Sequence, residues 1–354
     1  MTFKRLFSAN TYLENFTRNM TKTTFLAPTP LFRSFALLAI AMACAGAAQA
    51  QLTGAGSSLV RDVMTSWTVQ FGAASGGVSY DPAGSSAGIA RASDQSVDFG
   101  ATDVPLTTAA LRQAGLKQVP IAATAVAVIV NLPELGGKTI KLNGDVLADI
   151  YQGSIKEWNH SQITASNPGV VLPNKPIVPV WRADGSGQSY VLSAYLARSN
   201  AKWRRNIAAT NNLSLNVGKG VRGGQAMIDA VKATPGALGY EPLGAAQKSG
   251  LVIVELQNAA GKSVAPNAAS ITQALDSAQW SQESNSADLD GSAGPNTYPL
   301  TAVTYVLVPV APKVGRKNAL PFIQTAVAQG DAAAKQAGFV PLSASGKGLV
   351  AALR

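Results

Sequence analysis

Residues 119–132 have the sequence VPIAATAVAVIVNL, in which only Thr124 and Asn131 are polar. A strand with one face in solvent alternates apolar and polar residues, whereas a strand covered on both faces is apolar almost throughout. The run is also longer than an average strand of about five or six residues. It therefore predicts a long strand that is buried on both faces.

The rest of the chain alternates short apolar strands with amphipathic helices. Residues 57–71 carry an apolar residue at every fourth position from Leu59 to Phe71, which is helical spacing. Residues 297–310 predict a second long strand, and residues 318–338 predict one late helix. This alternation indicates an α/β protein.

Composition narrows the class of protein. The chain has 354 residues, 47% of them hydrophobic, which allows a large core and suggests two domains. The formal charge is +10, but residues 1–50 carry five basic residues and one acidic residue. Residues 51–354 then have 24 basic and 18 acidic residues, a charge of +6. No run of five like charges occurs, so we interpret the surface as mildly basic and predict no binding to nucleic acid.

The N-terminal segment is typical of an export signal. Arg33 precedes the apolar run FALLAIAMACAGAA, and the small residues of AQA, ending at Ala50, suit cleavage there. The apolar run is too short for a comfortable membrane span. We therefore predict a signal peptide over residues 1–50, with Met1 and Met20 both open as the start of translation.

Cys44 is the only cysteine of the chain. In a second interpretation it is lipidated, although AMAC lacks the large aliphatic residue that such sites usually have three positions earlier. Cleavage after Ala50 would leave a mature chain with no disulfide and no thiolate for metal binding or catalysis.

Three apolar strands each run into a Gly-Ser turn followed by a helix. The turns are GAGSS at 54–58, GSSAG at 84–88 and GSGQS at 185–189. A helix N-terminus has unpaired N–H groups and a partial positive charge, so it suits an anion. Glycine lets the backbone approach the ligand, and serine both caps the helix and donates its hydroxyl. Three such turns in one chain indicate an anion-binding site.

Arg182 adds a full charge immediately before the third turn, in VWRADGSGQSY at 180–190. Its planar fork is able to hold two oxygens of one oxyanion. A plain surface salt bridge with Asp184 is the alternative. Both interpretations are compatible, because Asp184 would then hold the guanidinium in place from behind.

Asp103, in DFGATDVP, bears on the identity of the anion. A carboxylate repels an anion unless the anion still has a proton to donate. Phosphate has such a proton near neutral pH and sulfate does not, so a buried carboxylate would reject sulfate by roughly 10²–10⁴ in selectivity. The alternative is that Asp103 only caps the helix that starts near Thr107.

Seven motifs together resemble a known family. LTGAGSS, AGSSAGI, VDFGATDVPL, DIYQGSIKEWN, NPGVVLP, RADGSGQS and PGALGY occur in the order found in the periplasmic phosphate-binding proteins of Pst-type ABC importers. The resemblance covers nearly all of residues 51–311. It implies a periplasmic, monomeric protein without a cofactor that binds inorganic phosphate and delivers it to a membrane ABC permease.

The resemblance also implies the type II periplasmic-binding-protein fold, an α/β fold with two lobes and the ligand in the cleft between them. Lobe one would be residues 51–127 plus 299–354, and lobe two residues 128–298. The two long apolar strands would be the crossing hinge strands.

Carried over position by position, the family's ligand shell falls on the three turns and on Asp103. Asp103 would accept the proton of the phosphate, and Asp184 would support the arginine from the second shell. The implied ligand-binding residues are Ser58, the amide of Leu59, Ser85, Asp103, Arg182, Ser186, Gly187 and Gln188. The chain departs from the family pattern at two places, with Leu59-Val60 for the usual Phe-Pro and Gln188 for the usual Thr.

Other functions remain open from the sequence. The second turn fits G-x-S-x-G, the motif of a serine hydrolase, with Ser86 as nucleophile and His160, the only histidine, as base. One histidine and no mature cysteine leave little to bind a metal. Within the binding class, the ligand could be sulfate, arsenate or molybdate, or the chain could be a secreted relative that has lost transport.

Overall fold

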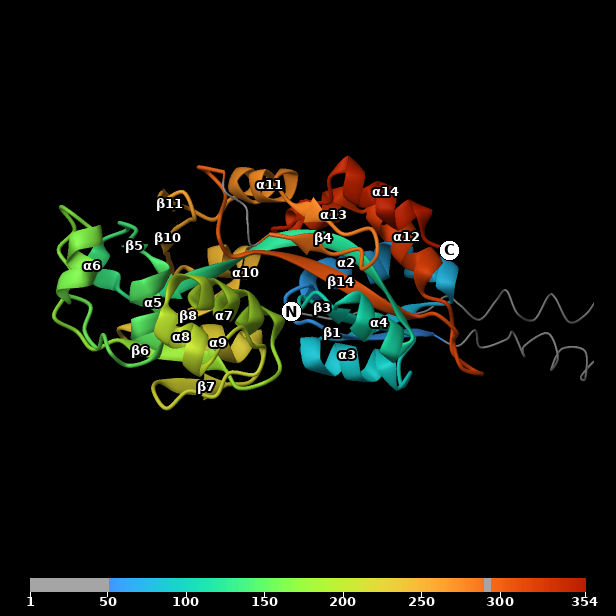
Figure 1. The fold of residues 1–354 in the computed structure, drawn as a ribbon, viewed down its shortest axis with the longest axis horizontal. Coiled ribbons are helices and arrows are strands. Elements are labelled where there is room, and N and C mark those ends of the chain that lie inside the picture. The colour runs from blue at the N-terminus through green and yellow to red at the C-terminus, as the bar shows by residue number, and fades with distance from the viewer. Residues whose placement is uncertain (1–50, 290–293) are drawn as a thin grey trace, which may run out of the picture. The chain divides into compact units, whose positions relative to one another are not determined.

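A ten-stranded sheet forms the centre of the fold, in the order β2-β1-β3-β14-β4-β8-β6-β7, with β15 and β9 also paired to β4 (Figure 1). The computed structural model describes residues 51–289 and 294–354. The predicted signal peptide, residues 1–50 with Met1, Met20, Cys44 and the cleavage site, lies outside the described residues.

Most strands are short, and two are long. They are β1 (Leu52–Gly56), β2 (Val78–Asp81), β3 (Phe99–Thr102), β4 (Leu116–Val130), β5 (Lys141–Leu142), β6 (Val178–Arg182), β7 (Lys219–Val221), β8 (Ala237–Pro242), β9 (Val252–Ile253), β10 (Glu255–Gln257), β11 (Ser263–Val264), β12 (Gln279–Trp280), β13 (Ala287–Asp288), β14 (Thr301–Pro309) and β15 (Val340–Pro341).

Helices follow most of the strands. They are α2 (Arg61–Phe71), α3 (Ser85–Ser93), α4 (Thr108–Ala114), α5 (Gly144–Tyr151), α6 (Ser161–Ser166), α7 (Gly187–Ser199), α8 (Ala201–Asn206), α9 (Gly224–Ala233), α10 (Leu243–Ser249), α11 (Ala268–Asp276), α12 (Leu320–Gln329), α13 (Asp331–Gln336) and α14 (Ala344–Ala352), with 3₁₀ turns at Gly72–Ser75 and Pro133–Leu135.

The strand β4 confirms the prediction made from its apolar sequence. All of its residues are buried except Lys117, which is partly buried. It pairs antiparallel with β14 from Leu116 to Ala125 and with β8 from Val126 to Val130. β4 therefore joins the part of the sheet that contains β2, β1, β3 and β14 to the part that contains β8, β6 and β7. The second predicted long strand, β14, is buried along its whole length beside the first part of β4.

Parallel pairing places the three Gly-Ser turns at carboxyl ends of strands. β1 lies parallel to β2 and β3, and β6 lies parallel to β7 and β8. The helices α2, α3 and α7 follow β1, β2 and β6, so each begins where its strand ends. Crevices at the carboxyl ends of strands are where open α/β sheets bind their ligands.

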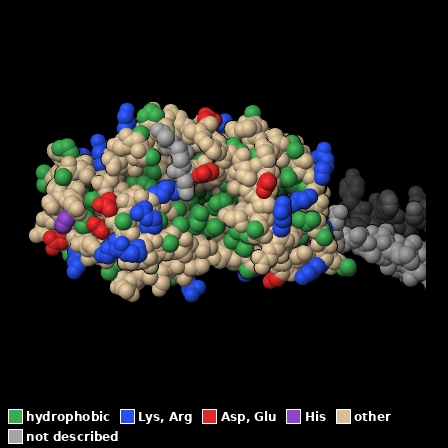
Figure 2. All heavy atoms as spheres, viewed as in Figure 1, with side chains coloured by type: hydrophobic (Ala, Val, Ile, Leu, Met, Phe, Trp, Pro, Cys, Tyr) green, Lys and Arg blue, Asp and Glu red, His purple; other side chains and the backbone are tan. Residues whose placement is uncertain are grey.

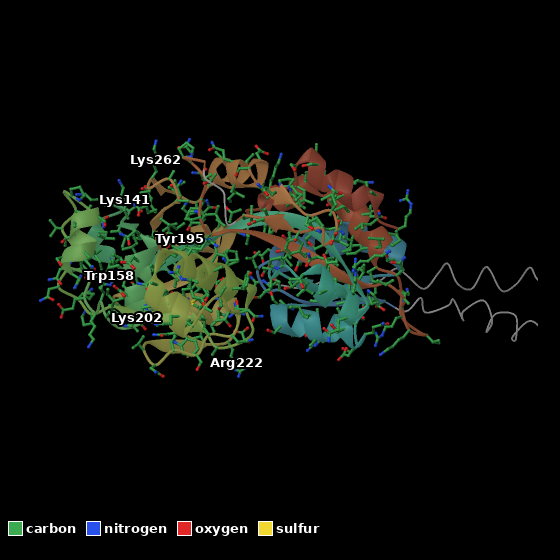
Figure 3. The ribbon with its side chains drawn as sticks, in the orientation of Figure 1. Lys141, Trp158, Tyr195, Lys202, Arg222 and Lys262 are labelled. Atoms are coloured by element: carbon green, nitrogen blue, oxygen red, sulfur yellow. The ribbon has the colours of Figure 1, made fainter. Side chains whose placement is uncertain are left out.

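Tryptophans fill much of the core. Trp67, Trp158 and Trp203 are the largest fully buried side chains. Trp158 is labelled in Figure 3. Its indole Nε1 donates to the carbonyl of Gly236, the residue before β8, at 2.9 Å.

The late helix differs from its prediction. A single helix over 318–338 is wrong, because the segment forms α12 and α13 with a break at Gly330. The indole Nε1 of Trp67 donates to the carbonyl of Gly330 at 3.1 Å. A Cβ at position 330 would lie 2.2 Å from that same nitrogen. The break therefore accommodates a side chain from α2, far away in the sequence.

Charged side chains are scattered over the surface. In the space-filling view, Lys and Arg side chains occur on several separate parts of the face that is drawn, and hydrophobic side chains gather near its middle (Figure 2). Among residues 51–289 and 294–354, no helix is both long and apolar enough to cross a membrane.

Candidate functional site

Backbone hydrogen bonds join the three Gly-Ser turns to one another. The amide of Gly84 donates to the carbonyl of Gly56 at 2.7 Å, which links the second turn to the first. The amide of Ser86 donates to the carbonyl of Gly185 at 3.0 Å, which links the second turn to the third. The starts of α2, α3 and α7 therefore meet at one place.

Asp103 lies at this meeting point, just after β3. Its side chain is buried, with 3% exposed. Oδ2 accepts from the hydroxyls of Ser57 at 2.5 Å and Ser85 at 3.3 Å, and Oδ1 accepts from Thr304 at 2.6 Å. Burial raises the pKa of the carboxyl, and the three hydroxyls partly offset that rise.

The third turn packs directly on this carboxylate. A Cβ at Gly187 would lie 2.3 Å from Oδ2 of Asp103 and 2.5 Å from the hydroxyl of Ser85. Real Cβ atoms do not approach oxygen so closely, so only glycine fits at the start of α7. The backbone of α7 thereby comes close to Asp103, as a glycine at a binding turn allows.

Arg182 ends β6 with its side chain fully buried. Its Nε donates to Oδ1 of Asp184 at 2.6 Å, and its Nη2 donates to Oδ2 of the same carboxylate. Burial alone would lower the pKa of the guanidinium, but the bond to Asp184 outweighs it and the pKa is raised. The arginine is therefore charged, and two sides of its fork are held by one carboxylate.

The remaining nitrogen of the guanidinium reaches the first turn. Nη1 of Arg182 donates to the hydroxyl of Ser58 at 3.2 Å. The backbone of Arg182 is held as well, because its amide donates to the hydroxyl of Tyr240 at 2.9 Å. Tyr240 in turn shares a hydrogen bond with Ser189 in α7 at 2.7 Å. Hydrogen bonds therefore hold the arginine at both its backbone and its guanidinium.

The other predicted residues also lie at the turns. Ser186 is the N-cap of α7, where its hydroxyl accepts from the amide of Ser189 at 3.4 Å. The amide of Leu59 donates to the hydroxyl of Ser57 at 3.1 Å. Gln188 is 1% exposed, and both polar atoms of its side chain lack a hydrogen-bond partner among the described residues.

Buried amide groups without partners are rare, because leaving them unpaired costs roughly 1–3 kcal/mol per group. Gln188 carries two such atoms at the second position of α7, next to Gly187. Position 188 is one of the two places where the sequence departs from its family pattern. The amide of Gln188 therefore lacks the partner that buried amides normally have.

Sequence similarity to known proteins agrees with this geometry. The profile of the PBP superfamily domain matches residues 43–327. The phosphate-binding protein PstS of Xylella fastidiosa (strain Temecula1) is 33% identical over 296 residues, which is 82% of this chain and 81% of the relative. This chain belongs to the PstS family. The PstS protein of Haemophilus influenzae is 32% identical over 298 residues, 83% of this chain and 89% of the relative.

Solved structures of low sequence identity share the PstS fold. A high-affinity periplasmic phosphate-binding protein called PfluDING has a TM-score of 0.67 at 20% identity, covering 86% of this chain and 93% of its own. A phosphate-binding protein of Stenotrophomonas maltophilia has a TM-score of 0.60 at 17% identity, with the same coverage. The two-lobed type II periplasmic-binding-protein fold is confirmed, and β4 is paired with β14 along its first part and with β8 along its last.

The PstS family is one of solute-binding proteins, and the hydrolase alternative finds no support in the geometry. The hydroxyl of Ser86 accepts from the side-chain amide of Asn211 at 2.9 Å, and no described contact joins it to histidine. His160 instead caps α6, where its ring accepts from the amide of Gln162 at 3.4 Å. In Figure 1, α6 and α3 lie in different halves of the fold.

The capping role considered for Asp103 is wrong. The N-cap of α4 is Thr107, whose hydroxyl accepts from the amide of Ala110 at 3.2 Å. Asp103 bonds to hydroxyls from β14 and from the first two turns instead.

Sequence reasoning missed four polar residues around the site. Ser57 belongs to the first Gly-Ser turn, so the turn motif could have identified it. No local motif marks the other three, because Thr304 lies in the apolar strand β14, and Tyr240 and Glu241 lie in β8. All four are buried within the fold.

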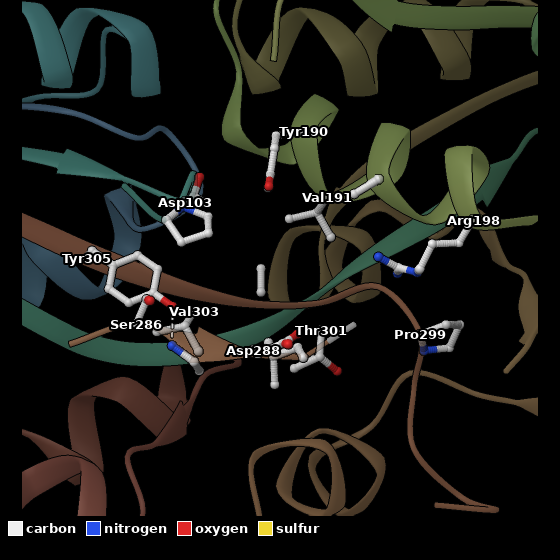
Figure 4. Close-up of a pocket in the computed structure, with 15 residues that line it drawn as sticks. Asp103, Tyr190, Val191, Arg198, Ser286, Asp288, Pro299, Thr301, Val303 and Tyr305 are labelled. Atoms are coloured by element: carbon white, nitrogen blue, oxygen red, sulfur yellow. Dashed lines mark hydrogen bonds between the residues drawn. The ribbon is translucent and has the colours of Figure 1, made fainter. Parts of the chain in front are cut away.

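A cavity of about 280 Å³ adjoins Asp103. Figure 4 shows Tyr190 and Val191 of α7 on one side and Val303 and Tyr305 of β14 on the other. The cavity therefore lies between α7 and β14, and the carboxyl of Asp103 is part of its wall.

Proposed function

We propose that this protein binds inorganic phosphate where the three turns meet and delivers it to a membrane ABC permease. The names of its PstS relatives support the ligand. We propose further that the protein acts in the periplasm as a monomer after loss of residues 1–50, and that it makes or breaks no bond of its ligand. One observation carries the proposal: a buried carboxylate and a buried arginine face the starts of three helices.

The helix starts supply donors for the anion. The first backbone N–H groups of a helix have no acceptor within it. The amides of Ser86 and Ser189 are already bonded to Gly185 and Ser186, so we propose that the amides of Gly187 and Gln188 bind the ligand. The hydroxyls of Ser58, Ser85 and Ser186 lie at the same turns. Together with Arg182 they would replace the water shell of the phosphate with charge-assisted hydrogen bonds.

The carboxylate of Asp103 would make the site selective. Its present partners are hydroxyl groups that donate to it. A protonated oxygen of phosphate is able to donate in the same way, whereas sulfate has only acceptors near neutral pH. Sulfate would therefore leave two unprotonated oxygens facing each other in a buried site.

The lobes of this protein are proposed to be residues 51–127 plus 299–354 and residues 128–298. The change of partner strand in β4, between Ala125 and Val126, supports the first boundary. The two proposed lobes also contact each other. The side chain of Gln118, in the first lobe, donates to the carbonyl of Ser284, in the second, at 2.8 Å.

The first experiment is a calorimetric titration of residues 51–354, stripped of bound anion, with phosphate and then with sulfate. We expect micromolar or tighter binding of phosphate at one site per chain and no heat from sulfate. Binding of sulfate as well would assign the site to tetrahedral oxyanions in general. No binding of phosphate would reject the proposed function.

Gln188 offers a second test, because its side-chain amide is buried and unpaired. Gln188→Leu removes both unpaired polar atoms and keeps a similar volume. We expect the ligand-free variant to unfold at a higher temperature than the wild type, since the desolvation cost is removed. Phosphate affinity should fall by about tenfold through loss of one hydrogen bond to an anion. Lower stability together with unchanged affinity would show that the amide serves only the fold.

A further inference from the structure

Glu241 is a second buried carboxyl group beside the proposed phosphate site. It lies on β8, is 3% exposed, and its Oε1 has no hydrogen-bond partner among the described residues. Together with Ser58 and Leu59 of the first turn, it lines a small cavity of about 30 Å³. This carboxyl is not among the groups proposed to contact phosphate.

The groups that face Glu241 do not neutralise it. From β6 and the turn after it come Arg182 and Asp184, and the hydrogen bonds described for the guanidinium of Arg182 go to Asp184 and Ser58, none of them to Glu241. From α2 come Arg61 and Asp62, which pair with each other at 2.9 Å, and Arg61 is 46% exposed.

The remaining neighbours of Glu241 are uncharged at neutral pH. Gly224, at the start of α9, approaches so closely that a Cβ there would lie 2.9 Å from Oε2 of Glu241. Burial raises the pKa of Glu241 to about 8, although Arg182 and then Arg61 lower it, and Asp184 raises it further. Tyr240, next in sequence, has its pKa raised by burial to about 12, so it stays neutral throughout this range.

An ionised Glu241 would conflict with a bound anion. The Arg182–Asp184 pair is neutral as a whole, and Asp103 is a further carboxyl at the site. A charged Glu241 and a phosphate dianion would then lie, together with Asp103 and Asp184, around one buried cation, Arg182. Like charges in such surroundings repel strongly.

We propose that Glu241 is protonated whenever phosphate is bound, so that phosphate binding in alkaline medium takes up one proton at this residue. Through its charge, Glu241 thereby lets the site hold its anion only below a limiting pH. The inference rests on the proposed function, since phosphate is the anion that it concerns.

The sign follows from linkage. Bound phosphate favours the neutral form of Glu241 and so raises its pKa above the value in the free protein. Affinity is then constant while the free protein already holds the proton, and it falls as the pH rises past the pKa of about 8. If the ionised form does not bind, the loss between pH 7 and pH 9.5 is roughly thirtyfold. Phosphate itself stays mainly a once-protonated dianion over the upper part of this range.

The test is phosphate titration calorimetry of residues 51–354 from pH 6 to pH 9.5, for the wild type and for Glu241→Gln, which imitates the neutral carboxyl. Each pH is measured in two buffers of different ionisation enthalpy, which counts the protons exchanged. We expect the wild type to lose about thirtyfold in affinity and to take up close to one proton at pH 9. The variant should lose less than about threefold and take up none.

Asp229→Asn is the control, because it removes an exposed carboxylate from α9, the helix whose first residue lies against Glu241, without touching the Arg61–Asp62 pair. Its pH profile should follow the wild type. Identical profiles for the wild type and Glu241→Gln would overturn the inference while leaving phosphate binding intact. If the glutamine variant does not fold, the proton count of the wild type decides, and a count of zero at pH 9 overturns the inference. No phosphate binding at pH 6 in any protein would reject the proposed function together with it.

Discussion

Arg182→Ala is expected to weaken phosphate binding by at least about 2 kcal/mol, or about thirtyfold. The change removes a fully buried positive charge from the site. It also strands Asp184, whose carboxylate takes two hydrogen bonds from the same guanidinium and whose pKa is lowered by that pairing against the effect of burial. An anion entering the variant would meet an unpaired carboxylate where it had met a cation.

The affinity is measured by calorimetry at low and at moderate salt. Arg182→Lys should give an intermediate affinity, since an ammonium keeps the charge but not the planar fork. Arg222→Ala is the control, because Arg222 is an exposed arginine just beyond β7, labelled in Figure 3. An alanine variant at position 182 with wild-type affinity would remove Arg182 from the binding site.

Asp103→Asn is expected to reduce the preference for phosphate over sulfate by about 10²–10⁴. The carboxylate only accepts hydrogen bonds, and its two oxygens already take hydroxyls from Ser57, Ser85 and Thr304. An amide in its place has a donor for an unprotonated oxygen. Sulfate would then gain a partner, and phosphate would lose the acceptor for its proton.

Competition between phosphate and sulfate is measured on the wild type and the variant at one pH and one salt concentration. Asp81→Asn serves as the control, because Asp81 is an exposed carboxylate paired with Arg91 in the same half of the fold. Selectivity that survives in Asp103→Asn would show that Asp103 only organises the hydroxyls around it.

Local sequence was enough to locate much of the site. Arg182 and Asp184 are two residues apart, so the chain itself brings their side chains together. The Gly-Ser turns were recognisable because a helix start needs a cap and a close approach needs glycine.

Contacts across long sequence distances were not predictable. Thr304 reaches Asp103 from 201 residues further along the chain, and it stands in a strand whose neighbours are apolar. Glu241 follows Tyr240 in an ordinary strand, and only burial without a partner makes it unusual. Such residues carry no local pattern, because their partners belong to other elements.

The sequence by itself determined the α/β class, the long buried strands and the turns with a cap and a glycine, because these depend on the periodicity and backbone preferences of neighbouring residues. The tertiary structure alone decided that the three turns meet, that Gly187 lies against Asp103, and that Gly330 breaks the late helix for Trp67. The physical reason is close packing in the core. The side chain that packs against each of these positions comes from an element far away in the sequence, so no neighbouring residue predicts the contact.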